Sequence, residues 1–282
     1  MPRRSTPTQA ATPAHARTRR LASAASVLPL AIGLASTGLP SGHPPTPPTP
    51  TTGQAIVEKG SFTPVCALPF KGVRNPAADD HCGIQGGSSD EAKIGESTAK
   101  NNFCAPTSNP DAVTYQQLIN LQAQSANVPK NLTDRKEVEN MGEGNYVSYV
   151  AVIKEAHYSD TTGGEAVNCN LSGNDPNDIH IVLMSDPNDT DECHSTTAEM
   201  SPHYRPANWT PDKLKALGKP VRIRGQLFYD NSHTPCSGSS RPNPKRASLW
   251  EIHPVYSLDV CQLGSLDACR NSNNPADWVP LE

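Results

Sequence analysis

The sequence RASLWEIHPV, residues 246–255, decides the fold because its polar and apolar side chains alternate. Trp250 and Ile252 fall on one face of an extended chain, whereas Glu251 and His253 fall on the other. Such alternation is typical of a strand with one face turned toward the core. We therefore predict that residues 247–260 form the last strand of a β structure, with an acid–histidine pair on its polar face.

Working outward from this strand, four upstream segments have the composition or the period of strands: 146–156, 165–171, 178–184 and 220–230, with a further accessory strand at 196–200. A short helix is predicted over 210–218, because Thr210 suits the N-cap, Pro211 the first turn and Gly218 the end. Three strands, a helix and two strands is the order of the OB fold. The predicted fold class is mainly β with short helices, built on an OB-like five-stranded barrel. A small β-sandwich is the alternative.

The N-terminal 40 residues have the layout of a secretory signal peptide. Residues 1–20 carry five arginines and no acidic residue, and an apolar, alanine-rich run follows over 21–39. A single membrane anchor is the alternative interpretation of this run. Residues 41–59 are rich in Pro and Thr and predict a stiff linker. We expect a secreted or periplasmic protein with no stable membrane span once the signal is removed.

The charge of the exported part argues against a nucleic-acid partner. Loss of residues 1–40 removes five of the 24 basic residues and none of the 28 acidic ones, which leaves a formal charge of −9. An acidic surface gains no counterion release on a phosphate backbone. The partner is expected to be an extracellular or envelope ligand such as a saccharide, a peptide or a protein.

All eight cysteines lie after the predicted signal, at positions 66, 82, 104, 169, 193, 236, 261 and 269. An even number in an oxidising compartment indicates a disulfide framework. No CxxC pair occurs, which disfavours zinc-knuckle and thioredoxin-like sites. We expect Cys66, Cys82 and Cys104 to pair mostly among themselves, and Cys261 to pair with Cys269.

The remaining segments divide around the barrel. Residues 60–142 predict a loop-rich, disulfide-stapled N-terminal cap, with one helix that starts near Asn109 and runs to about Ala126. Residues 143–262 form the barrel, and residues 263–282 are expected to be a C-terminal tail.

The polar faces of three predicted strands carry the candidate site. Asp178 and His180 share one face, and Glu251 and His253 share another. The face of 220–230 adds Arg222, Arg224 and Asp230, with His233 beyond its end; Glu199 and His203 approach from the accessory segment. In an OB barrel these faces are expected to join into one patch.

Three interpretations of this patch compete. The first is a solvated barrel exterior, where polar residues alternate because that side is wet. The second is a binding face, with Arg222, Arg224, Asp230 and His233 as ligand-binding residues. The third is a divalent metal site for assisted hydrolysis, with candidate ligands Asp178, His180, Glu251 and His253. The favoured function is an exported binding module without an assigned cofactor; a metal-assisted hydrolase and a structural envelope protein are the alternatives.

Four segments together resemble an uncharacterised family of exported bacterial proteins with KNNFCA, DxHI, GxLxxD and WEIHP segments in this order. Here these are residues 100–105, 178–181, 225–230 and 250–254. The resemblance spans about residues 66–260. It implies a common architecture and a common role for Asp178, His180, Asp230, Glu251 and His253. This chain departs from the family in its additional cysteines and its long Pro/Thr spacer.

Overall fold

The computed structural model describes residues 82–103, 105–203 and 205–281, all within one compact unit. The predicted signal peptide (1–40), the linker (41–59) and residues 60–81 of the cap lie outside the described residues. The described part of the chain contains no helix with the length and apolarity needed to cross a bilayer.

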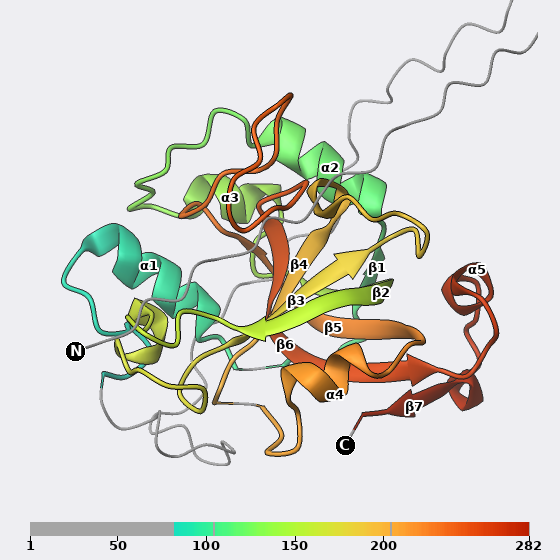
Figure 1. Cartoon of the computed structure of the whole chain (residues 1–282). Coiled ribbons are helices and arrows are strands. Elements are labelled where there is room, and N and C mark those ends of the chain that lie inside the picture. Colours follow the sequence, from blue (N-terminus) through green and yellow to red (C-terminus); the bar gives the residue numbers. More distant parts are fainter. Residues whose placement is uncertain (1–81, 104, 204, 282) are drawn as a thin grey trace, which may run out of the picture. The chain divides into compact units, whose positions relative to one another are not determined.

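Five strands close into a barrel (Figure 1). They are β2 (Tyr146–Tyr158), β3 (Ile179–Met184), β4 (Thr196–Met200), β5 (Pro220–Tyr229) and β6 (Trp250–Cys261). The strands pair in the order β2-β3-β4-β6-β5, and pairing of β2 with β5 completes the circle. All these pairs are antiparallel except β4–β6, which is parallel. The predicted five-stranded barrel is confirmed.

The barrel interior holds the apolar members of each alternating strand. Tyr149, Ile181, Ile223 and Trp250 all belong to this buried core. The short helix α4 (Pro211–Lys215) begins at Thr210, whose side chain accepts a hydrogen bond from the amide of Lys213, and its Leu214 joins the same core. The outer side chains of these strands are thereby left to build the polar face.

The predicted second strand at 165–171 is wrong. Its centre is the 3-10 helix η2 (Ala166–Asn168), and the left-handed backbone of Cys169 (φ 61°) and Asn170 (φ 56°) stops any extended pairing there. The segment predicted as an accessory strand, β4, takes the missing place in the barrel. It lies between β3 and β6, so the predicted third strand is the barrel's second.

The cap contains more regular structure than its composition indicates. Its elements are α1 (Glu91–Lys100), β1 (Asp111–Val113), α2 (Tyr115–Gln124) and α3 (Lys136–Met141). Helix α1 was not predicted; Asp90 caps it through the amide of Lys93. The helix predicted from Asn109 begins later, because Thr114 and Gln117 form a capping box at its start. Residues 111–113 are instead paired as β1 with β2.

The C-terminal segment is folded onto the barrel rather than being a free tail. It contains α5 (Leu266–Arg270), the 3-10 helix η4 (Pro275–Asp277) and β7 (Trp278–Pro280), which pairs antiparallel with the end of β6. A further 3-10 helix, η3 (Glu192–His194), precedes β4.

Three disulfide bonds are described: Cys82–Cys169, Cys193–Cys236 and Cys261–Cys269. The last confirms the prediction. Cys82 pairs outside its predicted group, with a cysteine in the connection between β2 and β3, as one of three cysteines must; the expected pairing of the other two, Cys66 and Cys104, lies outside the described residues. Disulfides of this number fit a non-cytoplasmic protein.

Candidate ligand site and metal centre

Strand register brings the polar side chains together on the outer face of the barrel. Glu199 on β4 is the direct partner of His180 on β3. The parallel bridge between Ala198 and Ile252 then sets Glu199 beside His253 on β6. Because β4 lies between β3 and β6, the two predicted acid–histidine pairs are joined through Glu199 rather than directly.

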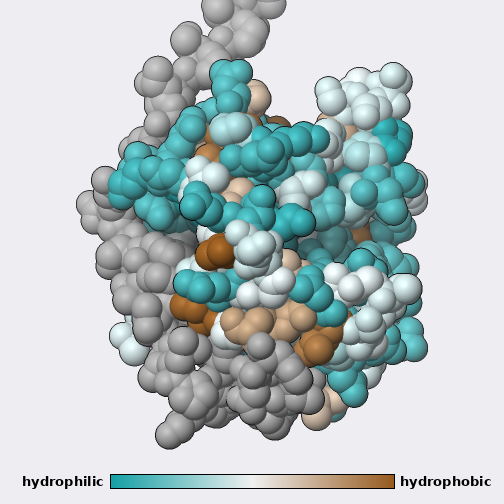
Figure 2. All heavy atoms as spheres, turned by 90° about the vertical axis from the view of Figure 1, so that its left-hand side faces the viewer, coloured by the Kyte–Doolittle hydropathy of each residue, from teal (hydrophilic) through white to brown (hydrophobic). Residues whose placement is uncertain are grey.

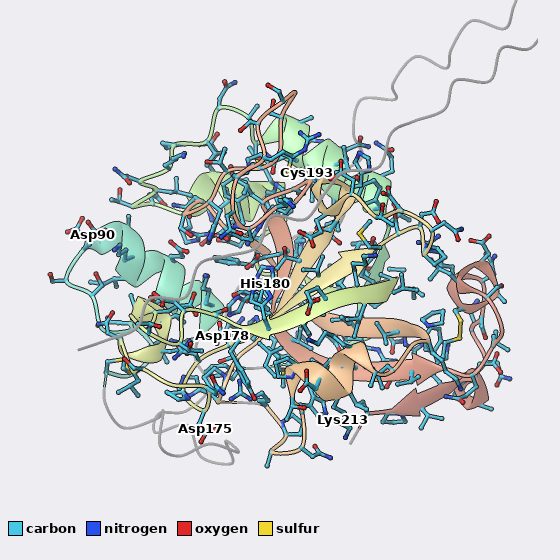
Figure 3. All side chains as sticks on the ribbon, viewed as in Figure 1. Asp90, Asp175, Asp178, His180, Cys193 and Lys213 are labelled. Carbon is cyan, nitrogen blue, oxygen red and sulfur yellow. A yellow bond between two sulfur atoms is a disulfide. The ribbon has the colours of Figure 1, made fainter. Side chains whose placement is uncertain are left out.

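The ring of His253 lies among three carboxylates. Its Nδ1 is 3.0 Å from Glu199 Oε2 and 3.4 Å from Glu251 Oε1, and its Nε2 is 3.3 Å from Asp178 Oδ2. His180 Nδ1 is 3.0 Å from the other oxygen of Glu199. Asp178 and His180 lie at the end of the barrel nearest α1 (Figure 3). All four members of the predicted metal set therefore belong to one cluster, with Glu199 at its centre.

This cluster is buried, so the interpretation as a solvated exterior is wrong. Asp178, Glu251 and His253 have 0% exposed surface, and His180 and Glu199 keep 4% each. Buried ionised groups are costly unless they are paired and hydrogen-bonded. The polar alternation of these strands therefore reflects an internal charged layer and not contact with water.

The segment that follows α1 covers the outer face. Asn102 Nδ2 donates a 2.6 Å hydrogen bond to Gln226 Oε1, and Gln226 Nε2 donates to the carbonyls of Ala99 (2.8 Å) and His253 (3.0 Å). The ammonium of Lys100 lies 5.5 Å from the ring centre of Phe228. Residues 99–102 are thus a lid tied directly to the outer face of β5 and β6.

Asp230 and His233 extend the cluster through a buried arginine. Arg246 Nη1 donates to Asp230 Oδ2 at 2.9 Å and to Glu251 Oε2 at 2.8 Å, and His233 Nδ1 lies 2.6 Å from Asp230 Oδ2. Arg246 and both carboxylates are at most 1% exposed. These two predicted ligand-binding residues therefore lie with the predicted metal ligands.

Arg222 and Arg224 lie elsewhere, which corrects the predicted continuous patch. Their guanidinium groups pair with Asp259, at 2.7 Å and 2.8 Å, and Arg222 also lies over the ring of Trp278 at 4.2 Å. In the β5–β6 ladder Arg222 is opposite Asp259, whereas Phe228 is opposite Glu251. Both arginines thus lie toward the other end of β5, and Arg222 there packs on the C-terminal segment.

Electrostatics within the cluster shift several pKa values. Burial opposes protonation of His253, but its contacts with Glu199 and Glu251 and the charge of Asp178 raise its pKa to about 10. Burial and the charges of Asp178 and Glu199 raise the pKa of Glu165 to about 8. Burial acts against ionisation of Glu199, yet the charge of Lys100 and the imidazoles hold its pKa well below its usual range.

His180 Nε2 is buried without a hydrogen-bond partner among the described residues, and so is one atom in each of three further residues of this cluster: Asp178 Oδ2, Glu199 Oε2 and His253 Nε2. The same three residues each offer one ligand atom, and those atoms lie within 4.8 Å of one another. Two of them, Asp178 and His253, were predicted as metal ligands. The other two predicted ligands do not belong to this group of three: His180 contacts Glu199, and Glu251 contacts His253.

A cavity of about 190 Å³ opens beside the cluster, between α1, η2 and the loop after β5. Its wall includes Lys93, Glu96, Lys100, Glu165 and His233. The surface on the side that carries α1 is mostly hydrophilic, with apolar residues gathered in its lower half (Figure 2).

Sequence reasoning missed Lys100, Glu165 and Arg246 as site residues. Arg246 lies at the start of residues 246–255, but arginine is mostly exposed in proteins, so nothing in the sequence indicated its burial. Lys100 opens the KNNFCA segment of the resemblance. Glu165 carried no signal, because its segment was taken for a strand.

Comparisons with protein-family models, with curated proteins and with solved structures found no match.

Proposed function

We propose that this protein is an exported binding module of the OB class that holds a small polar ligand in the cavity between α1, η2 and the loop after β5. The strand order β2-β3-β4-β6-β5 with one parallel pair supports the class, since it matches first, second, third, fifth and fourth strands of that fold. OB folds bind ligands on the second and third strands and on the loops after strands one and four.

The position of the cavity is the observation that carries this proposal. Glu165, Ala166 and Val167 come from the loop after the first barrel strand, and Ser232 and His233 come from the loop after the fourth. The cavity thus combines the two loops that OB folds use, and α1 closes it on a third side.

The lining favours a saccharide unit or a peptide end over a nucleic acid. A volume of about 190 Å³ is below the usual range of drug-sized sites, so it suits a ligand of one sugar or one amino acid. Its described lining includes no Phe, Tyr or Trp on which a base could stack. Lysines and carboxylates both line it, which suits a ligand that carries donors, acceptors or both charges.

Export is part of the proposal. The basic and apolar N-terminal run and the Pro/Thr-rich spacer are arranged as in a secreted protein, and the disulfide bonds are consistent with an oxidising compartment. N-terminal sequencing of the protein recovered outside the cytoplasm checks this part: a start near residue 41 is expected, and a start at Met1 would contradict it.

The ligand test is thermal shift and calorimetry with glucose, N-acetylglucosamine and glycylglycine at millimolar concentration. We expect at least one probe to raise the Tm of the wild type. The variant Ala166→Phe fills the cavity and removes this shift, while Ala276→Phe, at an exposed position on η4, keeps it. No shift with any probe, or an equal shift in both variants, rejects the cavity as the site and leaves the structural envelope role.

A metal-assisted hydrolase acting on a ligand in the same cavity is the second candidate. Glu165 favours it, because this side chain lines the cavity and its Oε2 is buried without a hydrogen-bond partner among the described residues. A positioned carboxyl group of this kind typically contributes about 10²- to 10⁴-fold as general acid or base. Hydrolysis of p-nitrophenyl glycosides and esters is the assay: Glu165→Gln should lose turnover to this extent, and Glu91→Gln on the exposed first turn of α1 should keep it.

A further inference from the structure

Two carboxylates of the buried cluster lack a permanent cation. Arg246 pairs with Glu251 and Asp230, but Asp178 and Glu199 have only imidazoles at ion-pair distance among the described residues. Buried carboxylates normally pair with a cation or coordinate a metal. A metal ion at Asp178 and Glu199 would take the place of the proton that these two carboxylates hold on the His253 imidazole between them.

One ligand atom from each of Asp178, Glu199 and His253 lies within 4.8 Å of the other two. Asp178 Oδ2, Glu199 Oε2 and His253 Nε2 are buried without a well-aligned hydrogen bond among the described residues, and their nearest polar contacts are ion pairs within this group, with Glu199 Oε2 3.0 Å from His253 Nδ1. Oδ2 and Nε2 are 3.3 Å apart. Two ligands of one tetrahedral zinc ion, each about 2.0 to 2.1 Å from it, are about 3.4 Å apart. Asp178 Oδ2 and His253 Nε2 thus have the spacing of two ligands of one ion, whereas Glu199 Oε2 is 3.0 Å from the other ring nitrogen, Nδ1, and has to turn toward Nε2 to complete the site.

Each of the three side chains is also held through its other polar atom. Asn168 Nδ2 donates a 3.0 Å hydrogen bond to Asp178 Oδ1, and His180 Nδ1 contacts Glu199 Oε1 at 3.0 Å. His253 Nδ1 faces Glu199 Oε2 at 3.0 Å and Glu251 Oε1 at 3.4 Å. Metal sites use such neighbours to fix the orientation and basicity of their ligands, and a carboxylate behind a ligating histidine is the usual arrangement.

We propose that Asp178, Glu199 and His253 bind a divalent zinc ion on the outer face of the barrel. One imidazole nitrogen and two carboxylate oxygens form a borderline ligand set that suits zinc better than magnesium or calcium, which prefer oxygen alone. Three protein ligands leave a fourth position free, as in catalytic zinc sites. This inference rests on the buried cluster and holds whatever occupies the neighbouring cavity.

The test uses the purified full exported chain, stripped with EDTA and dialysed. Zinc is then titrated by calorimetry, and bound metal is counted by mass spectrometry after gel filtration. We expect one zinc ion per chain and a higher Tm when zinc is present. Cobalt in place of zinc should give the visible absorption of a four- or five-coordinate ion.

Two isosteric variants test the carboxylate ligands, and a third variant tests a positioning residue. Asp178→Asn and Glu199→Gln should lose stoichiometric zinc, and His180→Asn, which removes a positioning residue, should weaken it about 10- to 100-fold. His194→Asn is the matched control, since His194 pairs with Asp189 on the surface, with 58% of its side chain exposed. This control should bind zinc like the wild type.

Several results would overturn the proposal. These are a wild type that retains no zinc, equal zinc binding by Asp178→Asn, or a loss of zinc in His194→Asn. Should Asp178→Asn fail to fold, Glu199→Gln and the cobalt spectrum of the wild type decide the matter: an octahedral spectrum, or unchanged zinc in Glu199→Gln, rejects the site. Because these measurements use metal alone, their failure is separate from failure of the sugar and peptide probes.

Discussion

Arg246 donates a 2.8 Å hydrogen bond from Nη1 to Glu251 Oε2, and neither side chain has any exposed surface. The same nitrogen reaches Asp230 at 2.9 Å. One guanidinium therefore compensates two carboxylates that the barrel keeps from water, and it joins the loop before β6 to the polar face of β6 itself. These ion pairs therefore stabilise the buried cluster by neutralising part of its negative charge.

Substitution of Arg246 should be strongly destabilising. Arg246→Met keeps the length of the side chain but leaves Asp230 and Glu251 buried without their cation. Breaking a buried pair in this way costs about 3 to 5 kcal/mol. Urea unfolding at neutral pH measures it as a lower transition midpoint.

The control for this prediction is Arg241→Met in the same loop. Arg241 is 45% exposed and its closest carboxylate, Asp191, is 3.7 Å away. An exposed pair is worth about 0 to 1 kcal/mol, so the midpoint should barely move. Equal midpoints for the two variants would show that the buried network does not stabilise the fold.

The lid over the cluster should depend on Asn102. Asn102→Ala removes the buried hydrogen bond to Gln226 Oε1, and an unsatisfied buried group costs about 1 to 3 kcal/mol. We expect faster amide hydrogen exchange in residues 99–102 as well as lower stability. Asn120→Ala, which removes an exposed hydrogen bond with Gln116, should change neither. Unchanged exchange in Asn102→Ala would contradict the role of this segment as a lid.

The His233–Asp230 contact predicts a pH dependence. The hydrogen bond to Asp230 raises the pKa of His233 above its ordinary value of about 6.5. Protonated His233 therefore stabilises the fold fully below about pH 6.5, and this contribution is lost as the pH rises through the higher folded-state pKa. The free energy of unfolding of the wild type, minus that of His233→Gln, should shrink as the pH rises above about 6.5. A difference that is constant or grows with pH would refute the pairing.

The disulfide bonds should differ in their contribution to stability. Cys82–Cys169 spans a sequence separation of 87, whereas Cys261–Cys269 spans 8. In the chain-entropy model these loops correspond to about 4.6 and about 2.6 kcal/mol. The paired Cys→Ser variants serve as controls for each other in urea unfolding, and we expect the larger loss for Cys82→Ser/Cys169→Ser. The reverse order would indicate that strain or residual structure outweighs loop length.

Local sequence was enough to predict most of the barrel. The alternation of Trp250 and Ile252 with Glu251 and His253 assigned the two faces of β6, because side chains of a strand alternate whatever it pairs with. The start of α4 followed from Thr210 and Pro211, since caps act within one turn. Gathering of acids and histidines on one face was likewise predicted, and the structure groups Asp178, His180, Glu251 and His253 in one cluster.

Only the tertiary structure decided what that face does. The sequence by itself established which residues point outward, because this follows from a period of two. Strand order, register and coverage depend on contacts between distant segments, so only the fold could insert Glu199 between His180 and His253. Nonlocal contacts also pair Arg222 with Asp259, away from the cluster. They place residues 99–102 over the polar face, which is therefore a buried layer of charge and not a solvated surface.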